Sequence, residues 1–272
     1  PQVSVFRFLL QSGDPKAVEA ALKTCRRMMD GGIYDQVMGG FHRYAVDQEW
    51  LVPHFEKMLY DQAQLMELYL DAWQITGEQE FRQVVEGIAN YVLRDLTHPE
   101  GGFYCAQDAQ SEGKEGKCFC WTEGELSALL TADEMKVARE ILGVSEEGNF
   151  IDRSDPEPLP NLNILSFKKP RTDLSESETK SVTGIFKKLA EVRGKRVPPA
   201  TDDKILASWN GLMIGAMART GRVLSEPKYL KAARKAHNFI KGRFWDVKSK
   251  RLAHRWREGD RDDSAQAQSY LL

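Results

Sequence analysis

Apolar residues recur along this chain with helical spacing, and the helices that they predict are of two alternating kinds. Residues 79–96 place apolar side chains at i, i+3, i+4 and i+7, which predicts a helix with one buried stripe and a solvated back. Residues 57–76 are apolar around most of the circumference, which predicts a helix that is buried on most sides. Gly77 is expected to end that helix, because glycine readily adopts the left-handed conformation of a C-terminal cap.

This pair of helices occurs again before and after these residues. Residues 206–220 are apolar all round, with Gly221 as the expected end, and a one-faced helix follows with its stripe on Tyr229, Ala233, Ala236 and Ile240. A short apolar segment before Gly13 and a stripe from Val18 to Met29 form a third pair at the start of the chain. We therefore expect at least six helices of an all-α domain, arranged as α-hairpins.

The links that follow the one-faced helices are also alike. Gly-Gly-Phe occurs at 39–41 and again at 101–103, and the segment from Phe244 is a third link without glycines. The period is longer than the ~34 residues of a tetratricopeptide solenoid, which is the competing interpretation. A buried helix that alternates with a half-exposed helix favours an α/α toroid, with inner helices that line a ring and outer helices around it.

An insert of roughly residues 104–200 separates the second pair from the third. We expect a short strand around 118–121, a helix that starts at Glu123 with a capping box, and a helix near 133–142. Ser175 or Ser177 is expected to cap a further helix that ends near Gly194, with basic residues on a solvated face.

Composition excludes some classes of function. Charged residues make up 29% of the chain and the net charge is −2, so nothing favours nucleic acid or an acidic membrane surface as a partner. No apolar run approaches the ~20 residues of a membrane span, and the first residues carry no signal-peptide pattern. The cellular location stays open.

The four cysteines do not form a disulfide framework in a chain of this length, which favours a compartment that keeps thiols reduced. They are interpreted as small buried side chains, and no set of residues has the spacing of zinc ligands. We expect neither a metal nor another cofactor.

The densest candidate chemistry lies in GGFHRYAVDQEWLVPHFEKMLYDQ at 39–62, where aromatic residues alternate with acids, bases and amides. Such a mixture is typical of a polar small-molecule pocket, and of a sugar site especially. The alternative is a hydrogen-bond network that fixes a loop onto the end of a helix. A sugar hydrolase needs two carboxylates and an epimerase needs an acid and a base. The catalytic candidates are therefore His42, His54, Glu56, Asp61 and Asp108.

Residues of two kinds are expected to bind the substrate at the same rim. Asp47, Trp50, Lys57 and Tyr60 belong to the same segment, and Asp203, Trp209 and Asn210 belong to the matching start of a neighbouring repeat. Each has a simpler interpretation. Asp202 and Asp203 could cap the helix that contains Trp209, and Trp50, Trp121 and Trp209 could fill the bore of the ring instead of stacking on a sugar. Trp73 and Trp245 are assigned to the core.

Several long segments together resemble the spermatogenesis-associated protein 20 family, whose members combine a thioredoxin-like domain with an α/α toroid. They are residues 39–62, EGGFYCAQDAQSE at 100–112, CFCWT at 118–122, GNF at 148–150, NIL at 163–165, and DDKILASWNGLMIGAMARTG at 202–221. The resemblance implies a toroid of the six-hairpin glycosidase and sugar-epimerase type. Residues 1–272 would be part of that one domain, without the thioredoxin-like domain and without the later hairpins.

Two departures from the family pattern bear on activity. Gln107 and Gln110 stand where the family is expected to carry acids, and AQAQSYLL at 265–272 stands where an acidic pair is expected before the tyrosine. Two hypotheses therefore remain open. The first is a carbohydrate-active or sugar-binding toroid, either hydrolase or epimerase, that binds a sugar or another polar metabolite. The second is a non-catalytic scaffold, or a redox-associated binding module that partners the thioredoxin-like domain. The isolated chain is also expected to self-associate through exposed faces of its inner helices.

Overall fold

The structure is a computed structural model that describes residues 1–262. The family departure at 265–272 lies outside the described residues. The chain divides into two compact units. Unit 1 comprises residues 9–56 and 108–200 together with Pro1, and unit 2 comprises residues 2–8, 57–107 and the chain from 201 on. The boundaries of the second stretch of unit 1 lie close to those expected for the insert, and the assignment of the whole chain to one toroid domain stays a prediction.

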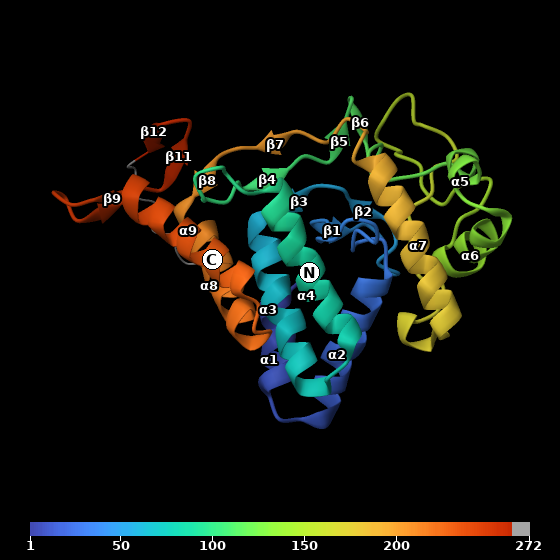
Figure 1. Cartoon of the computed structure of the whole chain (residues 1–272), viewed down its shortest axis with the longest axis horizontal. Coiled ribbons are helices and arrows are strands. Elements are labelled where there is room, and N and C mark those ends of the chain that lie inside the picture. The colour runs from blue at the N-terminus through green and yellow to red at the C-terminus, as the bar shows by residue number, and fades with distance from the viewer. Residues whose placement is uncertain (263–272) are drawn as a thin grey trace. The chain divides into compact units, whose positions relative to one another are not determined.

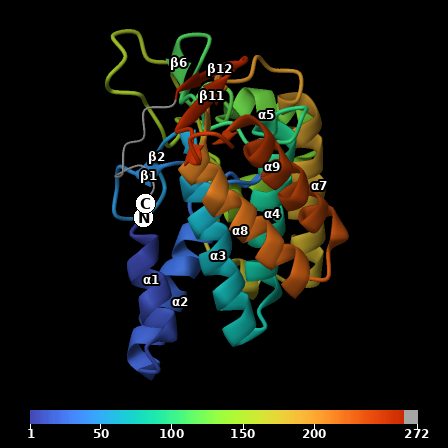
Figure 2. The ribbon, with the colours of Figure 1, turned by 90° about the vertical axis from the view of Figure 1, so that its left-hand side faces the viewer.

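Unit 2 is built on four long helices, which are α3 (Leu59–Thr76), α4 (Gln79–Asp95), α8 (Ala207–Val223) and α9 (Pro227–Arg243). Helix α3 packs against α4 and α8, and α8 packs against α9 (Figures 1 and 2). Helix α3 is buried on most of its circumference, whereas α4 and α9 each bury a single stripe. Helix α8 also buries one stripe, with Gly211 and Gly215 exposed, so the expectation of burial all round was wrong for this helix. The hairpins α3–α4 and α8–α9, which pack on each other through α3 and α8, form a sector of an α/α toroid.

Two glycines at helix ends behave differently. Gly77 ends α3 in the left-handed conformation with φ +75°, as expected. Gly221 does not end α8, which continues to Val223, so that prediction was wrong. A Cβ at Gly221 would lie 2.8 Å from both Cγ and N of Leu230. This glycine therefore serves the close approach of α9 to α8 instead of ending the helix.

Short strands precede and connect the helices of unit 2. Strands β3 (Lys57–Met58), β4 (Ala106–Gln107) and β7 (Thr201–Asp202) form one sheet in the order β3-β4-β7. Strand β8 (Ile205–Leu206) pairs with β11 (Arg255–Arg257), which pairs with β12 (Asp260–Asp262). A separate hairpin joins β9 (Trp245–Asp246) to β10 (Arg251–Leu252).

These strands correct some boundaries and assignments made from the sequence. Lys57 and Met58 belong to β3, so α3 starts two residues later than expected. No side chain caps the start of α8, so Asp202 and Asp203 are not its caps. Trp245 is 42% exposed on its hairpin and is not a core residue.

Two helices occupy the start of the chain, where the third pair is expected. Helix α2 (Pro15–Asp30) buries the predicted stripe in unit 1 and is capped by Asp14. Helix α1 (Val3–Gln11) contributes residues to both units, and its Val5 and Phe8 side chains are 47% and 70% exposed. An apolar face of this kind is what self-association would need, and self-association itself stays a prediction.

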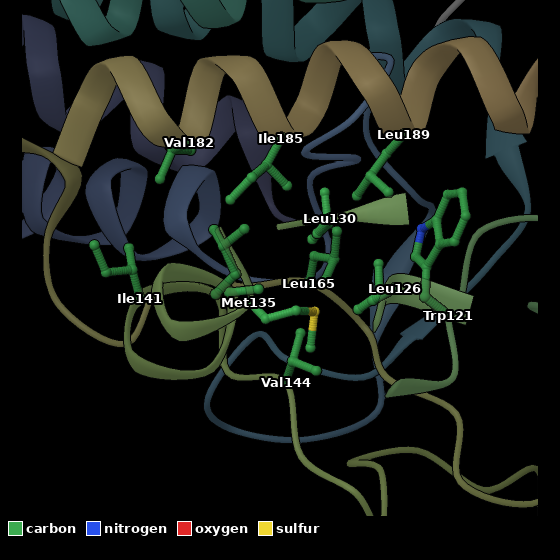
Figure 3. Packing of buried hydrophobic residues seen from close by; sticks show 12 residues of the cluster. Trp121, Leu126, Leu130, Met135, Ile141, Val144, Leu165, Val182, Ile185 and Leu189 are labelled. Atoms are coloured by element: carbon green, nitrogen blue, oxygen red, sulfur yellow. The ribbon is translucent and has the colours of Figure 1, made fainter. Parts of the chain in front are cut away.

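The remaining helices belong to unit 1: α5 (Glu123–Leu129), α6 (Ala132–Leu142) and α7 (Glu176–Arg193), with a 3-10 turn at Arg171–Asp173. Capping boxes start all three, on Thr122, Thr131 and Ser175, so Ser175 and not Ser177 is the cap of α7. Figure 3 shows α7 directing Val182, Ile185 and Leu189 into a cluster that also contains Leu126, Leu130, Met135, Ile141, Val144, Leu165 and Trp121.

The strand expected around 118–121 does not form. Residues 116–119 are a turn, in which the amides of Phe119 and Cys120 both donate to the carbonyl of Gly116 at 2.9 Å. Trp121 is fully buried and makes an isolated bridge with Asn163, so it fills the core of unit 1. The hairpin lies earlier, in β5 (Gln110–Ser111) and β6 (Lys114–Glu115).

Within residues 1–262 every sheet has only two or three strands, and the helices carry most of the core, so the all-α class with a strand-containing insert is confirmed. All four cysteines are free and buried, as expected. Burial raises the pKa of the Cys25 thiol to about 12. Among the described residues, no helix combines the length and the apolar character that a membrane span requires.

Candidate functional site

A small hairpin in unit 1 organises the aromatic and charged residues of the segment at 39–56. Strand β1 (Tyr44–Ala45) pairs with β2 (Pro53–His54) so that Tyr44 lies opposite His54. Their rings stack with centroids 5.1 Å apart and an interplanar angle of 25°. The loop between the strands is closed by Asp47, whose carboxylate accepts the backbone amides of Glu49, Leu51 and Val52. This hairpin fixes the position of the His54 ring.

Two glycines allow the same loop to pack on the end of α2. A Cβ at Gly31 would lie 2.4 Å from the Trp50 carbonyl oxygen, and a Cβ at Gly32 would lie 2.1 Å from that of Leu51. Trp50 itself has φ +63°, a left-handed conformation that is unusual for a bulky residue. Its carbonyl accepts the amide of Ile33 at 3.0 Å, which holds the loop in place. Strained non-glycine residues of this kind cluster at functional sites.

The His54 side chain lies between two carboxylates. Its Nδ1 is 2.8 Å from Oε1 of Glu115, which also accepts the amide of Phe55 at 3.1 Å. A carboxylate can only accept, so Nδ1 carries a proton, and whenever the ring is neutral the lone pair is on Nε2. Nε2 lies 3.7 Å from Glu56 Oε2, beyond hydrogen-bond length, and Glu56 is held by Arg43 Nη1 at 2.9 Å. The pair can therefore hold a basic nitrogen in a fixed orientation.

The His54–Glu115 pair lines an open cavity of about 650 Å³. One wall comes from the hairpin, with Tyr44 and Asp47, and the other comes from residues 149–154 of the insert. Lys114 holds that second wall, because its ammonium group contacts Asp155 Oδ2 and the carbonyl of Glu157, each at 2.7 Å. A cavity of this size, with aromatic faces and several polar groups, is within the range of small-molecule sites.

His42 occupies a different environment from His54. It is 2% exposed, its Nδ1 lies 2.8 Å from the carbonyl oxygen of Phe55, and its ring edge meets the rings of Phe55 and Phe119. The space beside it is about 20 Å³, which is room for about one water molecule. The catalytic assignment of His42 stays a prediction, and a space of this size offers no room for a sugar.

In unit 2 the predicted residues gather around the starts of α3 and α8. Lys57 is 1% exposed and places its ammonium group 4.4 Å from the ring centroid of Tyr91, whose hydroxyl lies 3.3 Å from Gln107 Oε1. Asp61 follows one turn later and is 6% exposed. Lys57, in β3, and Asp61, in the first turn of α3, are thus both buried in unit 2.

Two partly exposed rings lie near the same helix ends. Tyr60 and Trp209 make an edge contact with centroids 4.8 Å apart, and together they offer an aromatic surface that a sugar could stack on. Asn210 is fully buried and clamps both backbone groups of Phe103, at 2.8 and 2.9 Å. Asp203 is paired with Arg257 at 2.6 Å.

The structure therefore groups the predicted residues within each unit. Asp47, His54 and Glu56 belong to one hairpin region of unit 1, where Asp108 is exposed and accepts the amide of Gln110. Lys57, Tyr60, Asp61, Asp203, Trp209 and Asn210 belong to unit 2. A single cavity shared by all twelve candidates stays a prediction. Among residues 1–262, no group of three or more histidine, cysteine or acidic side chains is placed to hold a metal.

Sequence analysis missed Glu115, which orients His54. The residue lies in SEGKEGK at 111–117, a run rich in glycine and charge that carries no motif typical of a site. Glu112 and Gly113 both have positive φ, at 53° and 75°, and such a pair is the signal of a tight hairpin turn. These angles are known only from the structure, and Glu-Gly is not one of the dipeptides that signal such a turn in a sequence. Neither the hairpin nor its contact with His54, 61 residues away, could therefore be predicted.

The fold and these contacts define the class of protein, an α/α-toroid type of helical domain with a histidine–carboxylate pair at a polar cavity. The chain belongs to the spermatogenesis-associated protein 20 family. It is 39% identical to spermatogenesis-associated protein 20 of Homo sapiens over 90% of its length, and equally to that of Mus musculus. An uncharacterized protein of Caenorhabditis elegans is 35% identical over 82% of the chain. The chain spans about a third of the length of these relatives, 34% in each case. No protein-family model matches it.

Solved structures of sugar-processing proteins are among those similar to this chain. Cellobiose 2-epimerase of Bacillus thermoamylovorans is 12% identical, with 96% of this chain and 79% of the epimerase covered and a TM-score of 0.32. A family 76 glycoside hydrolase of Bacteroides thetaiotaomicron is also 12% identical, with 97% and 50% covered and a TM-score of 0.36. At these TM-scores the similarities carry no information about the substrate of this chain.

Proposed function

We propose that this chain is part of a domain that binds a sugar in the cavity beside His54, and that His54 transfers a proton on the bound sugar. The observation that carries the proposal is the His54–Glu115 pair at a cavity of about 650 Å³. The cavity also contains the Tyr44 ring, which can stack on the apolar face of a sugar, and polar groups that can bond to its hydroxyls.

The same geometry favours proton transfer at carbon over glycoside hydrolysis. Hydrolysis needs two carboxyl groups that act separately on the scissile bond. Here Glu115 is bonded to the His54 ring and to the Phe55 amide, and Glu56 is bonded to Arg43. An oriented imidazole is instead suited to remove a proton from the carbon beside a carbonyl, as an epimerase or isomerase requires. His54 is the base in this proposal, and Glu115 holds its tautomer.

The binding-module hypothesis keeps support from other residues. His42 lies beside a space for about one water molecule, Asp47 bonds three backbone amides, and Asn210 clamps Phe103. These side chains have structural roles that need no substrate. If catalysis is absent, the aromatic and polar cavity beside His54 would still bind a sugar without converting it.

The test uses the full-length protein and a panel of reducing mono- and disaccharides in D₂O. Nuclear magnetic resonance (NMR) spectroscopy would follow deuterium that enters the C2 position as the base exchanges the proton. We expect exchange that is lost in His54→Gln and slowed about a hundredfold or more in Glu115→Gln, in the range for a general base and its orientation. The matched control is Glu112→Gln, on the same hairpin but paired with Lys117. Exchange that survives in His54→Gln would refute the catalytic assignment, and sugar binding without exchange would support the binding-module hypothesis.

A further inference from the structure

Unit 1 contains a second cavity, of about 530 Å³, that the proposed sugar site does not use. Its floor is apolar and includes Cys118, Leu159, Pro160 and Leu162. The cationic side chains of Lys117, Lys195 and Arg196 also line it and form what we call its edge. Val197 contributes a side chain that is 53% exposed. A largely apolar pocket with a few charged groups is the ordinary form of a small-molecule site.

Hydrogen bonds cross-link the walls of this second cavity, so it is formed before any ligand arrives. The hydroxyl of Ser111 donates to the Val197 carbonyl at 2.6 Å. The Arg196 guanidinium group lies 3.7 Å from the centre of the Trp121 ring and donates to the carbonyls of Cys118 and Cys120, at 3.0 and 2.7 Å. A preformed cavity loses little conformational entropy on binding, which favours affinity.

The charges at the edge leave one cation in excess. Lys117 is paired with Glu112 at 2.9 Å, and Arg196 is paired with Glu125 at 3.0 Å. The remaining cation of the lining, Lys195, is exposed, and no side-chain partner for it is found in residues 1–262. Its ammonium group is therefore available to a ligand that carries a negative charge.

We propose that this cavity binds an amphipathic organic anion, with its apolar part on the floor and its anionic group at Lys195. The apolar floor supplies most of the affinity, because affinity follows the apolar area removed from water. Lys195 supplies the preference for an anion over a neutral or cationic molecule of the same length. The inference does not depend on the sugar site, since the two cavities have no lining residue in common.

The test uses the full-length protein, the fluorescent probe 1-anilinonaphthalene-8-sulfonate and decanoate as competitor. We expect saturable probe binding that decanoate displaces at a concentration at least about tenfold lower than decanol or decylammonium. Lys195→Glu should weaken probe binding at least about fivefold, because it replaces one exposed attraction by a repulsion. Val197→Asp should weaken it as well, and its exposed position leaves the fold intact.

The matched control is Lys187→Glu, an exposed lysine of α7 that does not line the cavity. Its affinity for the probe should equal that of the unmodified protein. The proposal is overturned if the probe does not bind, or if decanol competes as well as decanoate. It is also overturned if Lys187→Glu weakens binding as much as Lys195→Glu does, because the effect would then reflect net charge alone.

Discussion

Replacing Arg193 by methionine should strongly destabilise unit 1. The Arg193 and Asp35 side chains are 5% and 3% exposed and form a bidentate salt bridge, with N–O distances of 2.8 and 2.6 Å. Asp35 also accepts the amides of Val37 and Met38, both at 3.2 Å. This pair joins α7 to the turn that follows α2, so it supports the loop that carries the candidate site.

The magnitude follows from the charge that would be left behind. Arg193→Met removes the partner and leaves the Asp35 carboxylate buried and uncompensated, at a cost of about 3–5 kcal/mol. The double variant Asp35→Asn with Arg193→Met leaves no buried charge, so it should be clearly more stable than the single variant. Arg193→Lys keeps the charge but not the bidentate geometry, so its stability should lie between those of the single and the double variant.

Urea unfolding followed by near-ultraviolet circular dichroism measures the effect. With a slope of about 2 kcal/mol per molar urea, Arg193→Met should lower the midpoint by about 2 M. A shift below about 0.3 M would refute the argument that a buried charge is left without compensation. If the double variant is destabilised by the sum of the effects of Asp35→Asn and Arg193→Met, the two side chains are not coupled.

Three further predictions test other parts of the structure. Gly221→Ala should lower the free energy of unfolding by about 1–3 kcal/mol, because the added Cβ forces α9 away from α8. Gly215→Ala on the same helix has open space around it and should raise the free energy of unfolding by up to about 1 kcal/mol. Equal effects of the two variants in thermal unfolding would contradict the close approach of the helices. The Lys169 and Ser175 contacts lower the pKa of Glu178 from 4.5 to about 2, so the stability that it adds is present above pH 4.5 and is lost as the pH falls toward 2. Glu178→Gln keeps a cap at Ser175 but removes the titrating group, so the free energy of unfolding should fall less between pH 4.5 and pH 2 than in the unmodified protein. An equal fall in the variant would contradict the role given to Glu178. The four thiols should resist iodoacetamide at pH 8 until the protein unfolds, since they are buried and the pKa of Cys25 is raised to about 12; rapid labelling of the native protein would show that they are accessible.

Local signals made the helices predictable, whereas contacts between distant residues did not leave a readable pattern. The stripe of α4 and the capping boxes of α5 and α7 depend on residues three or four positions apart, so they could be identified from the sequence. Gly221 was misassigned because its role depends on packing against another helix, which a helix-end signal does not reveal.

The candidate site shows the same limit. The density of charges and aromatic residues at 39–62 drew attention to both His54 and His42, but only His54 lines a large cavity, whereas His42 lies beside a space of about 20 Å³. The contact with Glu115 distinguishes the surroundings of His54 from those of His42, and Glu115 reaches His54 only through the hairpin of the insert. Burial and partners over such distances can be obtained only from the folded structure.

The central claim is that Glu115 holds His54 with its Nε2 lone pair at a sugar-binding cavity. It can be tested by recording the imidazole nitrogens of the full-length protein labelled with ¹⁵N-histidine, during titration with a saccharide that binds. We predict a His54 ring with its proton on Nδ1, an Nε2 signal that shifts on sugar addition, and loss of the fixed tautomer in Glu115→Gln. A His54 ring protonated at Nε2, or His54 signals that do not change as the sugar saturates the protein, would contradict the claim.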